Sequence, residues 1–268
     1  DIPEEKIAQF HERLDRSNPI RIPTRYKRPS PDSFEEIKEP ITTPDGELKL
    51  RPYQMEGFNW LRSRWYNNLN SILADEMGLG KTVQVVCALN DLALHEGISG
   101  PFLVVAPLST LPHWQMEFER WTKLNVVVYH GNSQSRDLIR QTEFVVVNEE
   151  GETVKNAVQF DVLITNYDTM LIDFNIFAKI QWRYLVLDEA HKLKNSKGKL
   201  YQKMEALEFE YCVMLTGTPI QNRIDELWSL LHFLFPNKFD DLEGFKEKYE
   251  NPTSSKQVGE IQAIINPI

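Results

Sequence analysis

From Leu50 onward, short apolar runs alternate with stretches in which apolar residues recur at helical spacing. Several runs are continuously apolar, which favours strands that are buried on both faces of a sheet. The runs typical of strands are Ser71–Asp75, Phe102–Ala106, Val126–Tyr129, Val162–Thr165, Tyr184–Leu187 and Cys212–Leu215. Helical spacing is clearest in Tyr53–Tyr66, Thr82–His95, Pro112–Trp121, Gln134–Glu143 and Arg223–Phe233. The alternation predicts an α/β domain with a mainly parallel sheet and helices on both faces.

The two ends of the chain lack the regular alternation of apolar runs and helical spacing. Eight of the 15 prolines fall at or before Pro52, and apolar periodicity is missing there after a short predicted helix from Pro3 to Leu14. We therefore expect residues 15 to 45 to form a linker or an extended brace. After Pro236 the pattern weakens into acidic, helix-compatible sequence, and Val258–Ile268 resembles the start of a further segment. The predicted units are 1–45, 46–236 and 237–268.

Composition narrows the class of protein. Apolar residues make up 41% of the 268 residues and charged residues 26%, which is typical of soluble globular proteins and excludes collagen-like and fully disordered chains. Apolar runs such as Phe102–Pro107 are far too short to cross a bilayer, so we expect no membrane partner. No basic segment followed by an apolar stretch opens the chain, so nothing indicates secretion. Cys87 and Cys212 lie in apolar runs and are expected to be buried free thiols.

The net charge of −9 argues against a protein that coats nucleic acid indiscriminately. Phosphate contacts nevertheless need only a few cations on one face. Two basic clusters could supply them, although each could equally be a solvated surface. The clusters are Arg21, Arg25, Lys27 and Arg28, and Lys192, Lys194, Lys197 and Lys199.

A glycine-rich segment directly after the first apolar run carries the strongest chemical signal. It reads Asp75-Glu76-Met77-Gly78-Leu79-Gly80-Lys81-Thr82. Between a strand and a helix, glycines let backbone N–H groups approach phosphate oxygens, and the helix N-terminus adds partial positive charge. Lys81 would reach the terminal phosphates and the Thr82 hydroxyl would bind Mg²⁺. The match is partial because the general phosphate-loop pattern has Gly where Asp75 stands, and an ordinary glycine-rich turn is the alternative.

An acidic pair, Asp188 and Glu189, follows the apolar run Tyr184–Leu187 and would emerge at the carboxyl end of a strand, where open parallel sheets bind ligands. In phosphoryl transfer to water, one carboxylate holds Mg²⁺ and a second orients or deprotonates the attacking water. We assign Asp188 to the metal and Glu189 to the water; a helix cap is the alternative. His191 has no His or Cys partner at zinc spacing, so it is not expected to bind metal.

A third strand end carries the hydroxyl-rich turn Leu215-Thr216-Gly217-Thr218-Pro219, which could sense the phosphate end of a nucleotide. Alone it would simply be a turn. Three such loops at three strand ends together favour a nucleotide site.

The three strings, in this order, resemble the first motor lobe of superfamily-two helicases, and specifically that of Swi/Snf-type ATPases. They are Ile72–Thr82, Asp188–His191 and Leu215–Asn222. Within that group, Gly100–Thr110 and Val128–Gly131 are most similar to the chromodomain-helicase-DNA-binding (CHD) remodellers, and Asn125–Gly131 with Glu149–Lys155 points to a Kismet-like subfamily. The resemblance covers about residue 48 to the end. It implies a RecA-like lobe, with Asp75 agreeing with the remodeller version of the phosphate loop.

The resemblance also implies roles for individual residues. Gln54 would bond the adenine edge, since an amide both donates and accepts. Residues Asp75 to Thr82 would bind ATP, with Thr82 and Asp188 on Mg²⁺ and Lys81, Asp188 and Glu189 in catalysis. Contacts to the DNA backbone, which position the motor without reading bases, would come from a wider set. That set is Ser109, Thr110, Thr165, Asn166, Lys192, Lys194, Gly217, Gln221 and Asn222.

At the level of the whole protein, the resemblance implies a nuclear, DNA-dependent ATPase that moves histone octamers on double-stranded DNA. The family's motor needs a second lobe that supplies arginine fingers, and two chromodomains would precede residue 1, with 1–45 as the helix and brace that follow them. Residues 237–268 would lead toward the second lobe. This lobe alone is then expected to bind nucleotide with little turnover, because losing arginine fingers costs roughly 10³-fold or more.

Other functions fit parts of the pattern. A strand-separating helicase or a general double-stranded DNA translocase would share all three strings. A nucleotide-gated interaction module that never hydrolyses ATP would not need a water-activating acid such as Glu189. A metabolic kinase with a phosphate loop would not need the Leu215–Pro219 turn.

Overall fold

The fold is known from a computed structural model, which describes residues 20–21, 27–76, 78–148, 150–155, 157–217 and 224–249. Its centre is a six-stranded, fully parallel sheet with the strand order β2-β8-β7-β3-β6-β4. The strands are β2 (Ser71–Leu73), β3 (Phe102–Ala106), β4 (Val126–Val128), β6 (Val162–Asn166), β7 (Tyr184–Leu187) and β8 (Cys212–Leu215). The predicted α/β architecture is confirmed.

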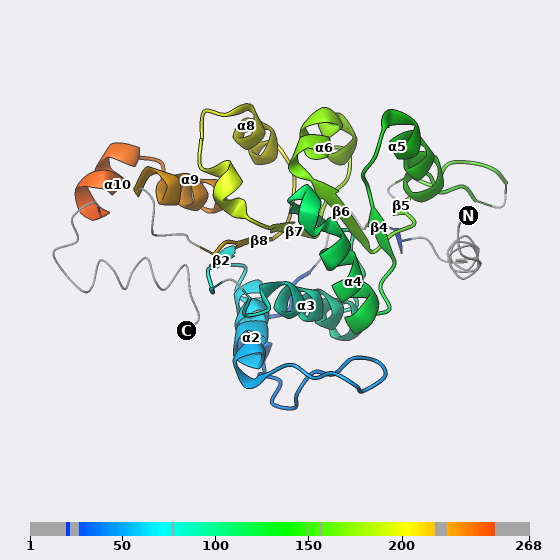
Figure 1. Cartoon of the computed structure of the whole chain (residues 1–268), viewed down its shortest axis with the longest axis horizontal. Helices are drawn as coiled ribbons and strands as arrows, with labels where there is room; N and C mark the ends of the chain where they lie inside the picture. The colour runs from blue at the N-terminus through cyan, green and yellow to red at the C-terminus, as the bar shows by residue number, and fades with distance from the viewer. Residues whose placement is uncertain are drawn as a thin grey trace.

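Helices cover both faces of the sheet (Figure 1). On one face lie α2 (Pro52–Tyr66), α3 (Lys81–His95) and α4 (Leu111–Trp121), and on the other lie α5 (Ser133–Ile139), α6 (Tyr167–Ile172), α8 (Lys199–Glu205) and α9 (Ile224–Leu234). Shorter or peripheral elements are β1 (Ile20–Arg21), β5 (Ala157–Val158), α7 (Phe174–Phe177) and α10 (Leu242–Tyr249). Single turns of other helix types span Pro31–Ser33, Leu108–Thr110, Ala190–Leu193 and, as a π-helix, Arg140–Phe144.

The domain has two hydrophobic cores, one on each face of the sheet, because successive side chains of a strand point to opposite faces. In β3, Leu103 and Val105 pack with the layer of α6 and α9, whereas Phe102 and Val104 pack with the layer of α2, α3 and α4. Every residue of β3 is buried, which explains its uninterrupted apolar sequence.

Some predicted boundaries were wrong. β2 ends at Leu73 and not at Asp75, so the phosphate-loop segment leaves the sheet two residues earlier. The expected helix Gln134–Glu143 is divided into α5 and the π-helix Arg140–Phe144. The predicted helix from Pro3 to Leu14 and the segment Val258–Ile268 lie outside the described residues.

Residues 27–50 run along α2 with little regular structure. The Asn59 side chain exchanges two hydrogen bonds with the backbone of Ile37, at 2.9 and 2.8 Å. The Arg62 guanidinium donates to the carbonyl of Glu35 and to the Asp91 carboxylate on α3, at 2.8 and 2.6 Å. Arg28, from the first basic cluster, lies over the ring of Trp65. These contacts hold the extended segment against the middle and the C-terminal half of α2.

Both cysteines are buried free thiols, as predicted. No helix in the described part of the chain is long and apolar enough to cross a membrane.

Candidate active site

The carboxyl ends of β2, β8 and β7 meet at one edge of the sheet, because these strands are neighbours. The described residues that directly follow these strands are far apart in the sequence, and the parallel sheet places them next to one another. A cavity of about 590 Å³ lies at this edge. Among the predicted residues, those that line it are Gln54, Gly78, Gly80, Lys81, Thr82, Thr110, Asp188 and Glu189.

The glycine-rich loop has a backbone conformation that suits glycine. Gly78 and Gly80 have φ angles of +89° and +80°, in the left-handed region. Gly80 immediately precedes α3, so the loop delivers the chain into a helix N-terminus. A Cβ atom added at Gly80 would lie 2.4 Å from the Gln54 side-chain nitrogen. The loop is therefore closely packed against α2.

Gln54 connects α2 to this loop. The side-chain oxygen Oε1 of Gln54 accepts a 2.9 Å hydrogen bond from the Arg51 backbone N–H, and the side-chain nitrogen donates to the Leu79 carbonyl at 3.3 Å. An amide has two N–H groups and two lone pairs, so it retains one donor and one acceptor beyond these bonds.

Lys81 is folded back onto its own loop. Its ammonium group donates to the carbonyl oxygens of Asp75 and Glu76, at 2.6 and 3.0 Å. Burial lowers the pKa of Lys81, and the charges of Asp75, Glu189 and Asp188 oppose that shift. Burial likewise raises the pKa of Asp75, against the charge of Lys81. Opposite charges are thus gathered in a partly desolvated site.

Asp188 is held from several sides. Its Oδ2 accepts a 2.9 Å hydrogen bond from the indole N–H of Trp114, and its Oδ1 accepts one from the Glu189 backbone N–H at 3.0 Å. The Tyr167 hydroxyl donates to its backbone carbonyl at 2.6 Å. Burial raises the pKa of the Asp188 carboxyl, and the Trp114 hydrogen bond opposes this.

Glu189 occupies the left-handed backbone region with a φ of +49°, which is uncommon for a residue with a side chain. Such conformations cluster at functional sites, where the surrounding structure maintains them. Its carboxylate lies 3.1 Å from Nδ1 of His191, so the histidine contacts the second acid.

Three of the residues predicted to bind ATP, Asp75, Glu76 and Leu79, are described but are not among those that line the cavity. Met77, Gln221 and Asn222 lie outside the described residues. Gly217 is described and follows Thr216, whose backbone N–H donates to the Leu73 carbonyl at 3.2 Å. That bond joins the turn after β8 to the end of β2, beside the glycine-rich loop.

The predicted DNA contacts fall into two groups. Ser109, Lys192 and Lys194 are exposed, and Lys194 pairs with Glu226 at 3.1 Å. Thr165 and Asn166 are buried: the Thr165 hydroxyl donates to the Tyr129 carbonyl, and the Asn166 side chain caps α6 through the Thr169 N–H. The Thr165 hydroxyl and the Asn166 side-chain oxygen are thus engaged within the protein, and contact of these two residues with DNA stays a prediction.

The family model described as "SNF2-related domain" matches residues 53–268. The chain belongs to this family.

Relatives of this SNF2-related chain include chromodomain-helicase-DNA-binding protein 7 of Gallus gallus, which is 43% identical over all 268 residues. Chromodomain-helicase-DNA-binding protein 9 of Homo sapiens is 42% identical over 263 residues, or 98% of the chain. The chain spans about 9% of the length of each of these relatives. Similarity to the CHD family, expected from the sequence, is confirmed.

A solved structure shares the fold. The SWI2/SNF2 ATPase core of Sulfolobus solfataricus in complex with dsDNA matches with a TM-score of 0.68 and 32% identity, over 87% of this chain and 45% of that one. The RecA-like lobe implied by the resemblance is thereby confirmed.

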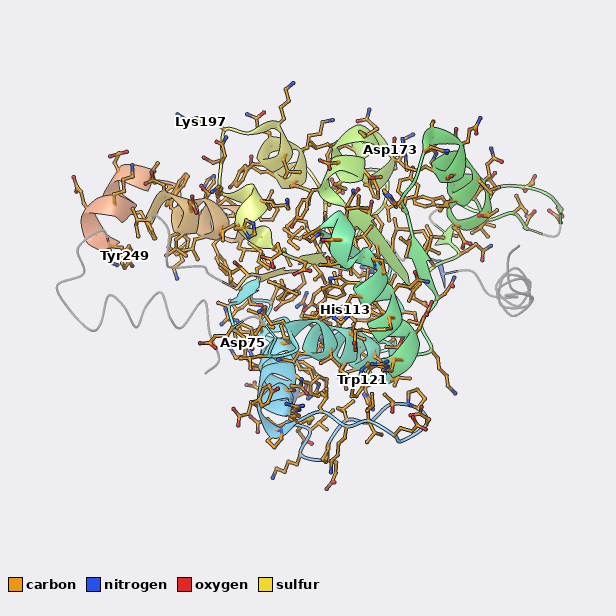
Figure 2. All side chains as sticks on the ribbon, viewed as in Figure 1. Asp75, His113, Trp121, Asp173, Lys197 and Tyr249 are labelled. Carbon is orange, nitrogen blue, oxygen red and sulfur yellow. The ribbon has the colours of Figure 1, made fainter. Side chains whose placement is uncertain are left out.

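One wall of the 590 Å³ cavity was not predicted from the sequence. It is formed by α4, through His113, Glu117, Arg120 and Trp121. Figure 2 shows His113 and Trp121 along this helix, on the same face of the sheet as α2 and α3. The available signal was position alone, since α4 directly follows the predicted Ser109–Thr110 contact.

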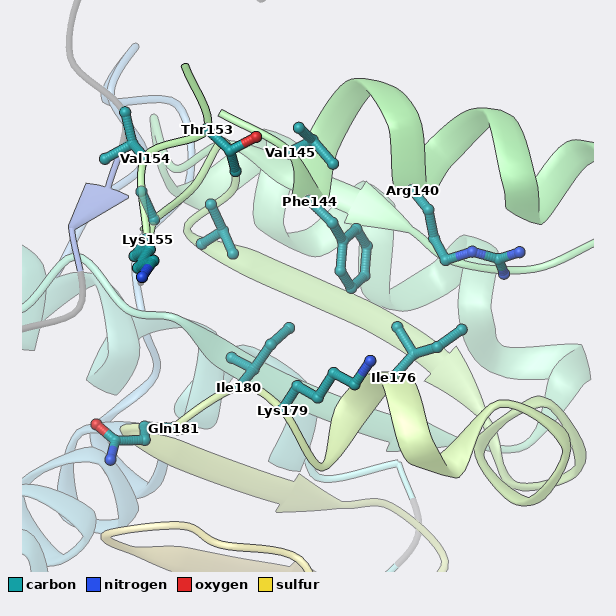
Figure 3. Close-up of a pocket in the computed structure, with 12 residues that line it drawn as sticks. Arg140, Phe144, Val145, Thr153, Val154, Lys155, Ile176, Lys179, Ile180 and Gln181 are labelled. Carbon is teal, nitrogen blue, oxygen red and sulfur yellow. The ribbon is translucent and has the colours of Figure 1, made fainter. Parts of the chain in front are cut away.

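A second cavity, of about 520 Å³, is separate from these motifs (Figure 3). Its apolar wall includes Phe144, Val158 and Ile180, and Lys155 and Lys179 also line it. None of the predicted site residues lines it.

Proposed function

We propose that this chain is the ATP-binding lobe of a nucleosome remodeller of the CHD type, which couples ATP hydrolysis to movement of histone octamers on double-stranded DNA. The observation that carries the proposal is the shared cavity of Lys81, Thr82, Asp188 and Glu189 at the carboxyl edge of neighbouring strands. A phosphate anchor and two acids in one cleft are the parts that phosphoryl transfer to water requires. The relatives' names and the SNF2-related match support the same function.

In this proposal the glycine-rich loop and the N-terminus of α3 cradle the phosphates of ATP. Lys81 exchanges its bonds to the Asp75 and Glu76 carbonyls for bonds to phosphate oxygens. Gln54 keeps its contact with the loop and offers its remaining donor and acceptor to the adenine edge. Glu189 orients or deprotonates the attacking water.

The donor set suits Mg²⁺. This ion binds through one or two protein oxygens together with substrate phosphates and waters, and the Thr82 hydroxyl and Asp188 carboxylate line the same cavity. The described residues contain no cluster of three or more His, Cys, Asp or Glu that would indicate a metal cage. Bound there, Mg²⁺ would neutralise charge on the phosphate oxygens.

DNA is proposed to follow the exposed turn at Ser109 and the surface of Lys192, Lys194 and Gly217, with backbone contacts only. Thr165 and Asn166 form hydrogen bonds within the protein, and their contacts with DNA remain sequence-based predictions. Gln221 and Asn222 remain sequence-based predictions of DNA contacts. The archaeal relative solved in complex with dsDNA supports a DNA-bound state for this fold.

The proposed organisation keeps the units predicted above. Residues 1–45 connect chromodomains to the lobe, 46–236 form the ATP-binding lobe, and 237–268 lead to a second lobe that completes the site with arginine fingers. The lobe alone would then turn over little ATP. Nucleosomes are the substrate and the nucleus is the compartment.

The test is ATP turnover by the full-length protein with no DNA, with naked duplex and with nucleosomes. The greatest stimulation by nucleosomes supports the remodeller, with octamer movement as a second readout. Equal stimulation by naked duplex would instead support a general double-stranded DNA translocase, the second candidate that the archaeal match favours. Turnover indifferent to DNA contradicts both, and nucleotide binding without turnover indicates a nucleotide-gated interaction module.

A further inference from the structure

Trp114 of α4 contacts the acidic pair from the adjacent layer of the domain. Its indole N–H lies 2.9 Å from Oδ2 of Asp188, a residue 74 positions later in the chain. The Trp114 side chain is fully buried and packs against Phe118, with ring centroids 6.1 Å apart. A ring enclosed in this way has little rotational freedom, so its N–H has a fixed direction.

The two oxygens of the Asp188 carboxylate have different kinds of partners. Oδ1 accepts from the backbone N–H of Glu189, the next residue, and therefore follows the local chain. Oδ2 accepts from Trp114, which is anchored in another element. The indole contact is thus the one that relates the rotation of the carboxylate to the rest of the cavity wall. Each oxygen retains a lone pair for a further ligand.

We propose that Trp114 is a positioning residue, which holds the Asp188 carboxylate in the orientation that receives the nucleotide-bound divalent cation. The proposal rests on the function proposed above. It assigns a role to a side chain whose aromatic ring does not line the cavity. Partners of this kind, which orient a ligand without touching the metal, typically contribute 10- to 100-fold to metal affinity or activity.

Another buried tryptophan shows what a purely structural indole does here. Trp182 is also fully buried, and its N–H donates at 3.0 Å to the backbone carbonyl of Phe177. Trp114 instead donates to a carboxylate that lines the proposed nucleotide cavity. A hydrogen bond to an ionised acceptor is roughly twice as strong as one between neutral groups. Trp182 therefore provides a matched control.

The experiment replaces Trp114 in the full-length protein by β-(3-benzothienyl)alanine, in which sulfur takes the place of the N–H group while ring shape is kept. Trp114→Phe is the second variant, and benzothienylalanine at Trp182 is the control. Binding of a fluorescent, non-hydrolysable ATP analogue is followed by anisotropy, first without divalent cation and then during a Mg²⁺ titration. Urea unfolding of each variant monitors the fold.

At position 114, loss of the N–H should raise the Mg²⁺ concentration for half-maximal binding by about 10-fold or more. Affinity without Mg²⁺ should change by less than about 2-fold, and the Trp182 control should match the wild type. An unchanged Mg²⁺ midpoint overturns the inference. Equal loss of affinity with and without Mg²⁺ also overturns it, because the role of Trp114 would then be structural.

The wild-type titration separates this inference from the proposed function. If wild-type protein binds the analogue without any effect of Mg²⁺, the proposed cation site itself fails. If the wild type responds to Mg²⁺ and the Trp114 variant responds equally, only the role of Trp114 fails.

Discussion

The ammonium nitrogen of Lys81 lies 2.6 Å from the carbonyl oxygen of Asp75, six residues earlier in the same loop. This bond closes the glycine-rich segment on itself and directs a cation at the place where the loop faces the cavity. Phosphate oxygens would replace these carbonyls as acceptors. In this structure the carbonyl oxygens of Asp75 and Glu76 thus occupy the hydrogen bonds of Lys81 that phosphate oxygens would accept.

Lys81→Ala should reduce ATP turnover of the full-length protein by at least about 100-fold, because the transferred phosphoryl group loses its cationic anchor. The measurement is phosphate release with saturating nucleosomes. Urea unfolding should show a native-like transition, which separates loss of function from loss of fold. A variant with normal turnover would contradict the assignment of the site.

Gly80→Ala and Gly46→Ala place the same methyl group at positions of similar φ, +80° and +76°. Each should destabilise the fold by about 1 kcal/mol, because alanine is strained in the left-handed region. Only at Gly80 does the new Cβ meet the Gln54 side chain; at Gly46 nothing lies within 4 Å. Nucleotide affinity should therefore fall in Gly80→Ala alone, and equal affinities in the two variants would refute the close packing of loop and α2.

Arg62→Met should lower the free energy of unfolding by about 3 kcal/mol, since it leaves the buried Asp91 carboxylate without its guanidinium. The variant also loses the bond to Glu35 that fixes the extended segment to α2. Lys194→Met removes an exposed pair and should stay within about 0.5 kcal/mol of the wild type. Urea denaturation of both variants measures the difference, and equal values would show that the Arg62 pair is not structural.

Alkaline pH should destabilise the domain through Cys87. Burial raises the pKa of this thiol from its ordinary value of 9.0 to about 12. Its contribution to stability is fully present below pH 9 and is lost as the pH rises toward 12, because the unfolded chain ionises first. The slope approaches about 1.4 kcal/mol per pH unit. Urea midpoints at pH 8 and pH 10.5 should differ less in Cys87→Ala than in the wild type, and identical differences would exclude this origin.

Lys192→Ala should weaken DNA binding to a similar extent on all sequences, because a lysine on the backbone neutralises phosphate without reading bases. Loss of one phosphate contact should reduce the slope of log affinity against log salt by about 0.9. Titrations of two unrelated duplexes at several salt concentrations provide the measurement. Lys155→Ala, on the second cavity, is the control that should leave the slope unchanged.

Strands with four or five continuous apolar residues were predicted to the residue, as in Phe102–Ala106, Tyr184–Leu187 and Cys212–Leu215. The short pair β1 and β5 was missed, because two residues are too few to show a period. The helix α8 was missed, and its first residue, Lys199, was interpreted as part of a basic cluster. Asn166 was the available sign of α6, since its side chain caps that helix.

The candidate site was predictable where its residues are consecutive in the sequence, as in Gly78–Thr82 and Asp188–Glu189. It was not predictable where the contact depends on tertiary packing. The Trp114–Asp188 bond joins two elements from opposite halves of the sequence, and no spacing rule connects them. Thr165 was predicted as the last residue of its strand, but β6 continues to Asn166, and the buried Thr165 hydroxyl donates to the Tyr129 carbonyl.

The position of β2 at the edge of the sheet has a consequence for how the chain assembles. Its neighbour in the sheet is β8, and Ser71 pairs with Val213. During synthesis, β2, which leads into the phosphate loop, therefore cannot pair with β8 until the chain has been extended past Leu215. Closing so long a loop is slow compared with local helix formation. The nucleotide pocket is thus completed late, although its first motif is translated early.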